Sequence, residues 1–160
     1  MNCPIYTTQL VRSGRSQYRR MAISNTERGV RTVLEISRPL LEDSPQEKFC
    51  ILTLDTKHKV IGFHIVSHGT LDASLVHPRE VFQHAILSAA HSIILVHNHP
   101  TGELTPSRGD EEVTTRIKSV GHQLGINVLD HIIVGHDDGE WKGQSLAEYD
   151  IGGLAPITLN

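Results

Sequence analysis

The sequence has few cysteines and no long hydrophobic run, and both absences limit the classes of protein to which it can belong. Its only cysteines are Cys3 and Cys50, which excludes a framework of disulfides; Cys50 lies in an apolar run that predicts a small core residue. No stretch approaches the roughly 18 apolar residues of a bilayer span, and the N-terminus lacks the apolar core of a signal peptide. We therefore expect a cytoplasmic protein with no membrane partner.

The composition is that of a folded globular chain. The chain has 160 residues, of which 38% are hydrophobic and 21% charged, with 13 glycines and 7 prolines. These proportions exclude a disordered or collagen-like chain, and the length fits one domain that buries its own core.

Charge is unevenly distributed along the chain. Residues 1–43 carry seven arginines against four acidic residues, whereas residues 44–160 carry eight basic against fourteen acidic residues. Four of the arginines fall in one polar run and are Arg12, Arg15, Arg19 and Arg20. This run predicts either a solvated terminus or a contact with phosphate or an acidic partner.

The first part of the chain predicts one helix. Ser24 and Glu27 stand three residues apart, as in a capping box, and apolar residues at helical spacing predict a helix over 26–37 that Pro39 ends or kinks. The polar run 42–45 indicates a boundary, so we predict an N-terminal arm with one helix over residues 1–43 and the main domain over residues 44–160.

The main domain predicts alternating strands and helices. A hairpin of strands is expected over 49–54 and 60–66, further strands over 92–96 and 126–134, and a short strand and a turn after Trp141. Helices are expected over 78–90 and from the N-cap Ser107 to Gly125. The order predicts an α/β fold with a mixed sheet sandwiched by helices, in a single domain with a short N-terminal helical arm.

Two histidines and an aspartate indicate a metal site. His97 and His99 follow a predicted strand one residue apart, and Asp110 falls in the first turn of the next helix. An extended backbone at residues 97–99 would place both imidazoles on one side. Two histidines, one carboxylate and an open fourth position are typical of catalytic zinc, which lowers the pKa of water to about 7. The competing interpretation is two histidines that hydrogen-bond at a strand end.

A catalytic acid and base is also expected near such a metal. Glu47 precedes the strand 49–54 and is our candidate for moving the proton, with Glu80 and Glu103 as rivals. Ser107 can donate its hydroxyl to an oxyanion or serve as an N-cap. The pair Asp130 and His131 can support a ligand histidine, although a buried structural histidine is the commoner case.

These residues resemble a known motif. His97-Asn98-His99-Pro100, Ser107 and Asp110 have the order and spacing of the JAMM motif of MPN-domain metalloproteases, with a glutamate upstream. Further segments resemble the JAB domain of bacterial RadC-like proteins, and they are Gly69-Thr70-Leu71, His77-Pro78-Arg79-Glu80-Val81, His97 to Gly102 and Asp130 to Gly135. The resemblance covers about residues 45–145.

The resemblance implies an MPN/JAB fold, which is cytidine-deaminase-like, and a zinc-dependent peptidase or isopeptidase that acts on a protein or peptide. It assigns zinc binding to His97, His99 and Asp110, the acid and base role to Glu47, and stabilisation of the intermediate to Ser107. The alternative, supported by the basic run alone, is a DNA-repair-associated accessory or DNA-binding protein without protease activity. A site that holds zinc without turnover is a third hypothesis, and the oligomeric state is left open.

Overall fold

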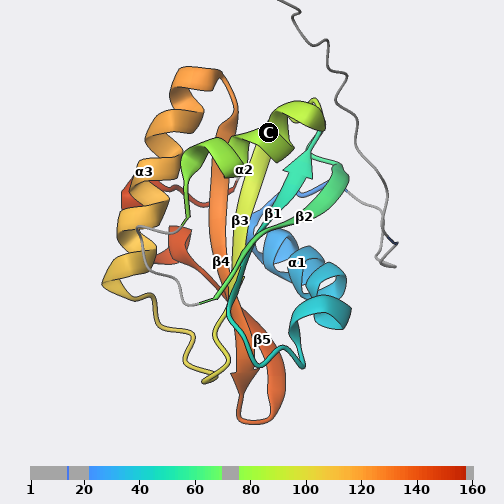
Figure 1. Cartoon of the computed structure of the whole chain (residues 1–160), viewed down its shortest axis with the longest axis vertical. Helices are drawn as coiled ribbons and strands as arrows, with labels where there is room; N and C mark the ends of the chain where they lie inside the picture. The colour runs from blue at the N-terminus through green and yellow to red at the C-terminus, as the bar shows by residue number, and fades with distance from the viewer. Residues whose placement is uncertain (1–13, 15–21, 70–75, 158–160) are drawn as a thin grey trace, which may run out of the picture.

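Five strands form one mixed sheet in the order β2-β1-β3-β4-β5 (Figure 1). The computed structural model describes residue 14 and residues 22–69 and 76–157. The strands are β1 (Lys48–Leu54), β2 (Val60–His68), β3 (Ser92–Asn98), β4 (Asn127–Asp137) and β5 (Glu140–Ser145). The helices are α1 (Thr26–Leu41), α2 (Pro78–Leu87) and α3 (Arg108–Leu124), and two short 3₁₀ helices, Leu146–Tyr149 and Ile151–Gly153, follow β5.

The pairing of the strands confirms the predicted mixed sheet. β1 pairs antiparallel with both β2 and β3, so the predicted hairpin is present, and β4 pairs antiparallel with β5. β3 and β4 are parallel, and α3 forms the crossover between them. The chain is a single α/β domain, as the sequence predicts.

β3 lies at the centre of the sheet and is buried on both faces. Ile93 and Leu95 join the core that α2 and α3 cover, whereas Ile94 and Val96 join the core that α1 covers (Figure 1). Alternate side chains of a strand point to opposite faces, which explains the continuous apolar run in the sequence. The same alternation places His97 on the face of α2 and α3.

α1 packs against β5 and β4, and its residues Val33, Ile36 and Leu41 are buried. The side chain of Asn25, rather than the expected Ser24, caps the helix by accepting from the Arg28 N–H. The helix also continues to Leu41 and contains Pro39, so the expected end at residue 37 was wrong and Pro39 does not end the helix.

The position of Pro39 in the last turn explains the difference. A proline there removes a single backbone donor, and the Glu42 N–H still donates to the carbonyl of Arg38 at 3.0 Å. The Arg38 guanidinium also donates two hydrogen bonds to the Glu42 carboxylate, at 2.7 and 2.9 Å, across this turn.

Two other boundaries differ from the prediction. α2 ends at Leu87 rather than at residue 90, because Ser88 caps it and Ala89 has a φ of 51°. β3 continues through Asn98, so His97 lies within the strand and not after it.

Within the described ranges, no helix has the length and apolar character needed to cross a bilayer. The basic run that includes Arg12, Arg15, Arg19 and Arg20 lies outside the described residues.

Candidate metal centre

The carboxyl end of β3 and the first turn of α3 bring three side chains together. His97 Nε2 lies 2.8 Å from His99 Nε2 and 3.0 Å from Asp110 Oδ1, and His99 Nε2 lies 3.8 Å from Asp110 Oδ2. The two histidines are two residues apart in an extended chain, so their side chains point to the same side of it. The structure therefore brings together the three residues that the sequence assigns to the metal.

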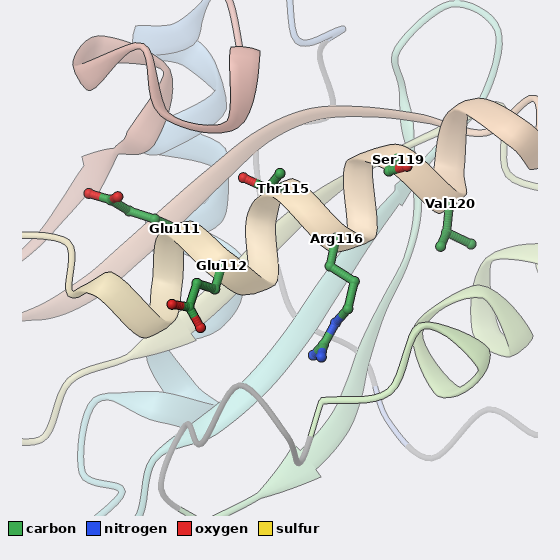
Figure 2. Close-up of a pocket in the computed structure, with 6 residues that line it drawn as sticks. All are labelled: Glu111, Glu112, Thr115, Arg116, Ser119 and Val120. Carbon is green, nitrogen blue, oxygen red and sulfur yellow. The ribbon is translucent and has the colours of Figure 1, made fainter.

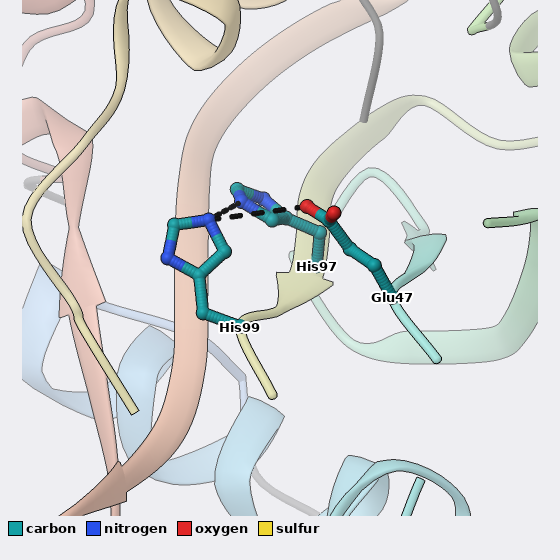
Figure 3. A group of neighbouring side chains, drawn as sticks. All are labelled: Glu47, His97 and His99. Carbon is teal, nitrogen blue, oxygen red and sulfur yellow. Dashed lines mark hydrogen bonds and ion pairs between the residues drawn. The ribbon is translucent and has the colours of Figure 1, made fainter. Parts of the chain in front are cut away.

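Glu47 reaches the same histidines from the start of β1 (Figure 3). Its Oε1 lies 3.9 Å from His99 Nε2, and single ligand atoms of Glu47, His97 and His99 all lie within 4.8 Å of one another. This group could hold a metal ion. Two carboxylates thus lie beside the histidines, Asp110 from the first turn of α3 and Glu47 from the residue before β1.

Burial distinguishes these two carboxylates. The side chains of His97 and Asp110 are 0% and 1% exposed, whereas those of His99 and Glu47 are 15% and 17% exposed. The Asp110 side of the centre is therefore closed by protein, and the Glu47 side faces solvent.

The loop between His99 and α3 is shaped by one glycine and one cap. Gly102 has a φ of 84° and its N–H donates to the His99 carbonyl at 3.0 Å, which turns the chain back. Ser107 caps α3 in a complete capping box with Asp110 as the third helical residue, as predicted. The cap determines where the Asp110 carboxylate is placed.

The Asp110 carboxylate has one oxygen held by hydrogen bonds and one directed at the histidines. The hydroxyl and the N–H of Ser107 donate to Oδ2 at 2.6 and 2.7 Å. Oδ1 is buried and accepts no hydrogen bond from the described residues, although it lies beside His97 Nε2. Burial by itself would raise the pKa of Asp110, but His97 and Ser107 hold this pKa well below its ordinary value. The group is a carboxylate with an acceptor free for a cation.

A chain of hydrogen bonds determines which nitrogen of His97 carries the proton. The Thr114 hydroxyl donates to the Asp110 carbonyl at 2.6 Å, so it can only accept from His131 Nδ1, also 2.6 Å away. Burial lowers the pKa of His131, which keeps the ring neutral and leaves its Nε2 as an acceptor. His97 Nδ1 therefore donates to His131 Nε2 at 2.8 Å, and Nε2 is the nitrogen that faces His99 and Asp110.

A backbone carbonyl orients His99 in a similar way. Its Nδ1 donates to the Glu103 carbonyl, because a carbonyl can only accept, and Nε2 is the nitrogen that faces His97. The Nε2 atoms of both imidazoles and a carboxylate oxygen of Asp110 thus converge at one point. Imidazole nitrogens and a carboxylate oxygen are ligand types that bind zinc, so the residues present fit a metal ion.

Several supporting contacts come from residues that the sequence analysis did not single out. The ring of Phe49 stacks on that of His97, with 6.3 Å between the ring centroids, and packs edge to face with that of His131, with 5.6 Å between the centroids. Thr114 follows Asp110 by four residues, so helical spacing alone could have indicated it. His131 was an expected support for a ligand histidine, and it does contact His97.

The rival glutamates do not join the group. Glu80 lies on α2 and pairs with Arg79 at 4.0 Å, as expected for a charge at a helix start. The Glu103 carboxylate accepts from the Thr105 N–H at 2.8 Å, and only its backbone carbonyl contacts the centre. Among the described residues, the glutamate that lies with the histidines is Glu47.

Asp130 lies in β4 next to His131, and its carboxylate makes the stability of the fold depend on pH. Its buried carboxylate accepts from the Ser145 hydroxyl at 2.9 and 2.7 Å and from the backbone N–H groups of His131 and Ala147. Burial, which outweighs these hydrogen bonds, raises the pKa of Asp130 to about 6.

This raised pKa predicts a stability change with pH. The folded state retains the proton between pH 4 and 6 while the unfolded state releases it, so the free energy of unfolding falls as pH rises through this window. Between pH 4 and 6, the free energy of unfolding of metal-free wild-type protein should fall by up to about 3 kcal/mol more than that of Asp130→Asn. Denaturant titrations at each pH measure this difference. Asp43→Asn, at an exposed position, is the control; parallel pH profiles for wild type and Asp130→Asn would contradict the prediction.

Two open hollows lie on the surface of the described part of the chain. One, of about 500 Å³, follows the outward face of α3 and contains none of the metal-centre residues (Figure 2). It is lined by Glu111, Glu112, Thr115, Arg116, Ser119 and Val120. The other, also about 500 Å³, lies between the loop 101–105 and the end of β4, and none of the metal-centre residues lines it.

Comparison with known proteins supports the resemblance seen in the motifs. Residues 27–150 match the RadC-like JAB domain. The chain is 46% identical over 111 residues to a UPF0758 protein of Chlorobaculum tepidum, covering 69% of this chain and 50% of that protein. A UPF0758 protein of Finegoldia magna is 56% identical over 92 residues, covering 58% and 41%. The chain spans about half the length of the curated relatives it matches, and their names state no reaction.

Proposed function

The chain belongs to the RadC-like JAB domain family, and on that premise we propose that it is a zinc-dependent hydrolase of amide bonds in peptides or isopeptides. The observation that carries the proposal is the convergence of His97 Nε2, His99 Nε2 and Asp110 Oδ1 beside a second, more exposed carboxylate. Such a donor set with a separate acid and base is typical of catalytic zinc sites.

We assign the third ligand to Asp110 rather than to Glu47. Asp110 is buried, is anchored through Oδ2 by Ser107, and directs an oxygen without a hydrogen bond at His97. Glu47 immediately precedes β1 and, like His99, is partly exposed to solvent. A substrate must approach from the exposed side, which suits a group that transfers protons and not one that completes the ligand set.

Zinc bound by these residues would supply Lewis acidity for a scissile carbonyl and lower the pKa of a water molecule to about 7. Glu47 accepts the proton of the attacking water and delivers it to the departing amine. His131 and the Glu103 carbonyl hold the two imidazoles in the tautomer that presents Nε2. The Ser107 hydroxyl, which donates to Asp110 here, would turn to donate to the oxygen of the scissile carbonyl.

The test combines metal analysis with detection of cleavage. Protein purified from zinc-supplemented cells should contain stoichiometric zinc by mass spectrometry and should cleave members of a library of peptides and lysine-linked isopeptides. Chelation should abolish cleavage, and added zinc should restore it. Protein without stoichiometric zinc would contradict the metal assignment. Zinc-loaded protein that cleaves no member of the library would contradict the hydrolase assignment and favour a site that only binds metal.

A further inference from the structure

Asn98 lies between the two histidines of the centre and faces the opposite side of β3. It is the last residue of the strand and is 2% exposed, and its neighbour in the parallel strand β4 is Val134. Because side chains alternate along a strand, Asn98 points away from the metal ligands. Its buried amide therefore acts on something other than the metal.

The amide of Asn98 binds the backbone on either side of Glu47. Its Oδ1 accepts from the Lys48 N–H at 2.8 Å, and its Nδ2 donates to the Gln46 carbonyl at 3.2 Å. The backbone pairing of β1 with β3 ends at Phe49 and His97. The Asn98 side chain thus continues the pairing past the end of the ladder, with one donor and one acceptor as in a peptide group.

A third hydrogen bond completes the support of this segment. The Glu47 carbonyl accepts from the Gly69 N–H at 2.8 Å, which ties the segment to the end of β2. Residues 46–48 are therefore held from β3 on one side and from β2 on the other. The Glu47 carboxylate projects from this fixed segment to within 3.9 Å of His99 Nε2.

We infer that Asn98 is a positioning residue that holds Glu47 within reach of the metal centre through the backbone of residues 46–48. The inference rests on the proposed function, in which Glu47 is the acid and base. A general base must lie within hydrogen-bond reach of the proton it removes, and a displacement of about 1 Å can lower a rate about 100-fold.

The chemistry of the two contacts selects asparagine. The contacts require an acceptor toward Lys48 and a donor toward Gln46, so a flipped amide would place like groups against each other. Aspartate keeps the acceptor but loses the donor, and alanine loses both. Ser44 offers a matched control, because its hydroxyl also donates to the Gln46 carbonyl, at 2.8 Å, without contacting Asn98.

The experiment is a double-mutant cycle on the zinc-loaded protein. Turnover of a peptide substrate and zinc affinity by chelator competition are measured for wild type, Asn98→Ala, Glu47→Gln and the double variant. Asn98→Ala should lower kcat at least about 10-fold in wild type but change it less than about twofold in Glu47→Gln. Zinc affinity and KM should stay within about twofold, and Ser44→Ala should behave as wild type.

Hydrogen exchange gives a readout that is independent of turnover. The Lys48 amide should be protected in wild type and in Asn98→Asp, which keeps the acceptor, and should exchange rapidly in Asn98→Ala. Asn98→Asp should have an intermediate kcat, and it serves as the test variant if Asn98→Ala does not fold. Unchanged protection of Lys48 in Asn98→Ala would overturn the contact on which the inference depends.

The outcomes separate the inference from the proposed function. An equal loss of kcat on removing Asn98 in both backgrounds, or a loss of zinc, would overturn the positioning role while leaving Glu47 as the base. Full turnover in Glu47→Gln would instead overturn the proposed function, and the inference with it.

Discussion

Replacing Glu47 by glutamine should lower turnover by about 10²- to 10⁴-fold while zinc remains bound. The amide has almost the same shape as the carboxylate but cannot accept the proton of the attacking water. The ligand atoms on His97, His99 and Asp110 are not altered, so metal analysis should give the same zinc content as wild type. The measurement is kcat/KM for peptide cleavage together with zinc stoichiometry on the same preparation.

Glu80→Gln provides the matched control, because Glu80 pairs with Arg79 on α2 and does not contact the histidines. It should keep both zinc and turnover. Loss of zinc in Glu47→Gln would show that Glu47 is a metal ligand, which the 4.8 Å grouping with the two histidines would also allow. Retained turnover in this variant would remove Glu47 from the mechanism.

Much of the metal centre could be predicted because its main residues are close in sequence. The spacing of His97, His99 and Asp110 is set by a strand end, a glycine turn and a helix cap, and each of these leaves a local signal. The capping box of Ser107 and Asp110 is the clearest example, since the pattern that identifies the helix start also fixes the position of the carboxylate.

Most partners of the supporting contacts could not be predicted in the same way. His131 was expected to support a ligand histidine, but that its partner is His97, 34 residues away, was not predicted, and neither was the contact of Asn98 with Lys48 across 50 residues. These pairs depend on the registers of β3 with β4 and with β1, and local periodicity does not determine register between distant strands. A family resemblance assigns the ligands and the base, but these supporting contacts are observed only in the folded chain.

The first helix was predicted from the sequence, but the strands against which it packs were not. Its residues Val33 and Ile36 have the helical spacing that the sequence analysis used, and the helix is present. Which strands this apolar face covers depends on the position of β5, whose sequence signal is weak. The match to the RadC-like JAB domain begins at residue 27, within this helix. The boundary at residues 43 and 44 stays a prediction.

The hydrogen bond between His97 and His131 predicts a large effect of both residues on zinc affinity. His97→Ala should abolish stoichiometric zinc binding, because it removes a ligand, and His131→Ala should weaken zinc binding by about 10- to 100-fold. His131 does not reach the metal side of His97; it accepts from Nδ1 at 2.8 Å and so keeps the Nε2 lone pair directed at the ion. Chelator competition measures both variants against wild type.

Thr114 separates the orienting effect of His131 from a general loss of packing. Thr114→Val has nearly the same volume but cannot accept from His131 Nδ1, whereas Thr114→Ser keeps the hydroxyl. If the hydrogen bonds from Thr114 through His131 orient His97, Thr114→Val should weaken zinc binding, as His131→Ala does. Thr114→Ser should bind zinc about as tightly as wild type. Equal zinc affinity in the valine and serine variants would show that His97 presents the same nitrogen without this chain, and that the ring packing of Phe49 alone holds it in place.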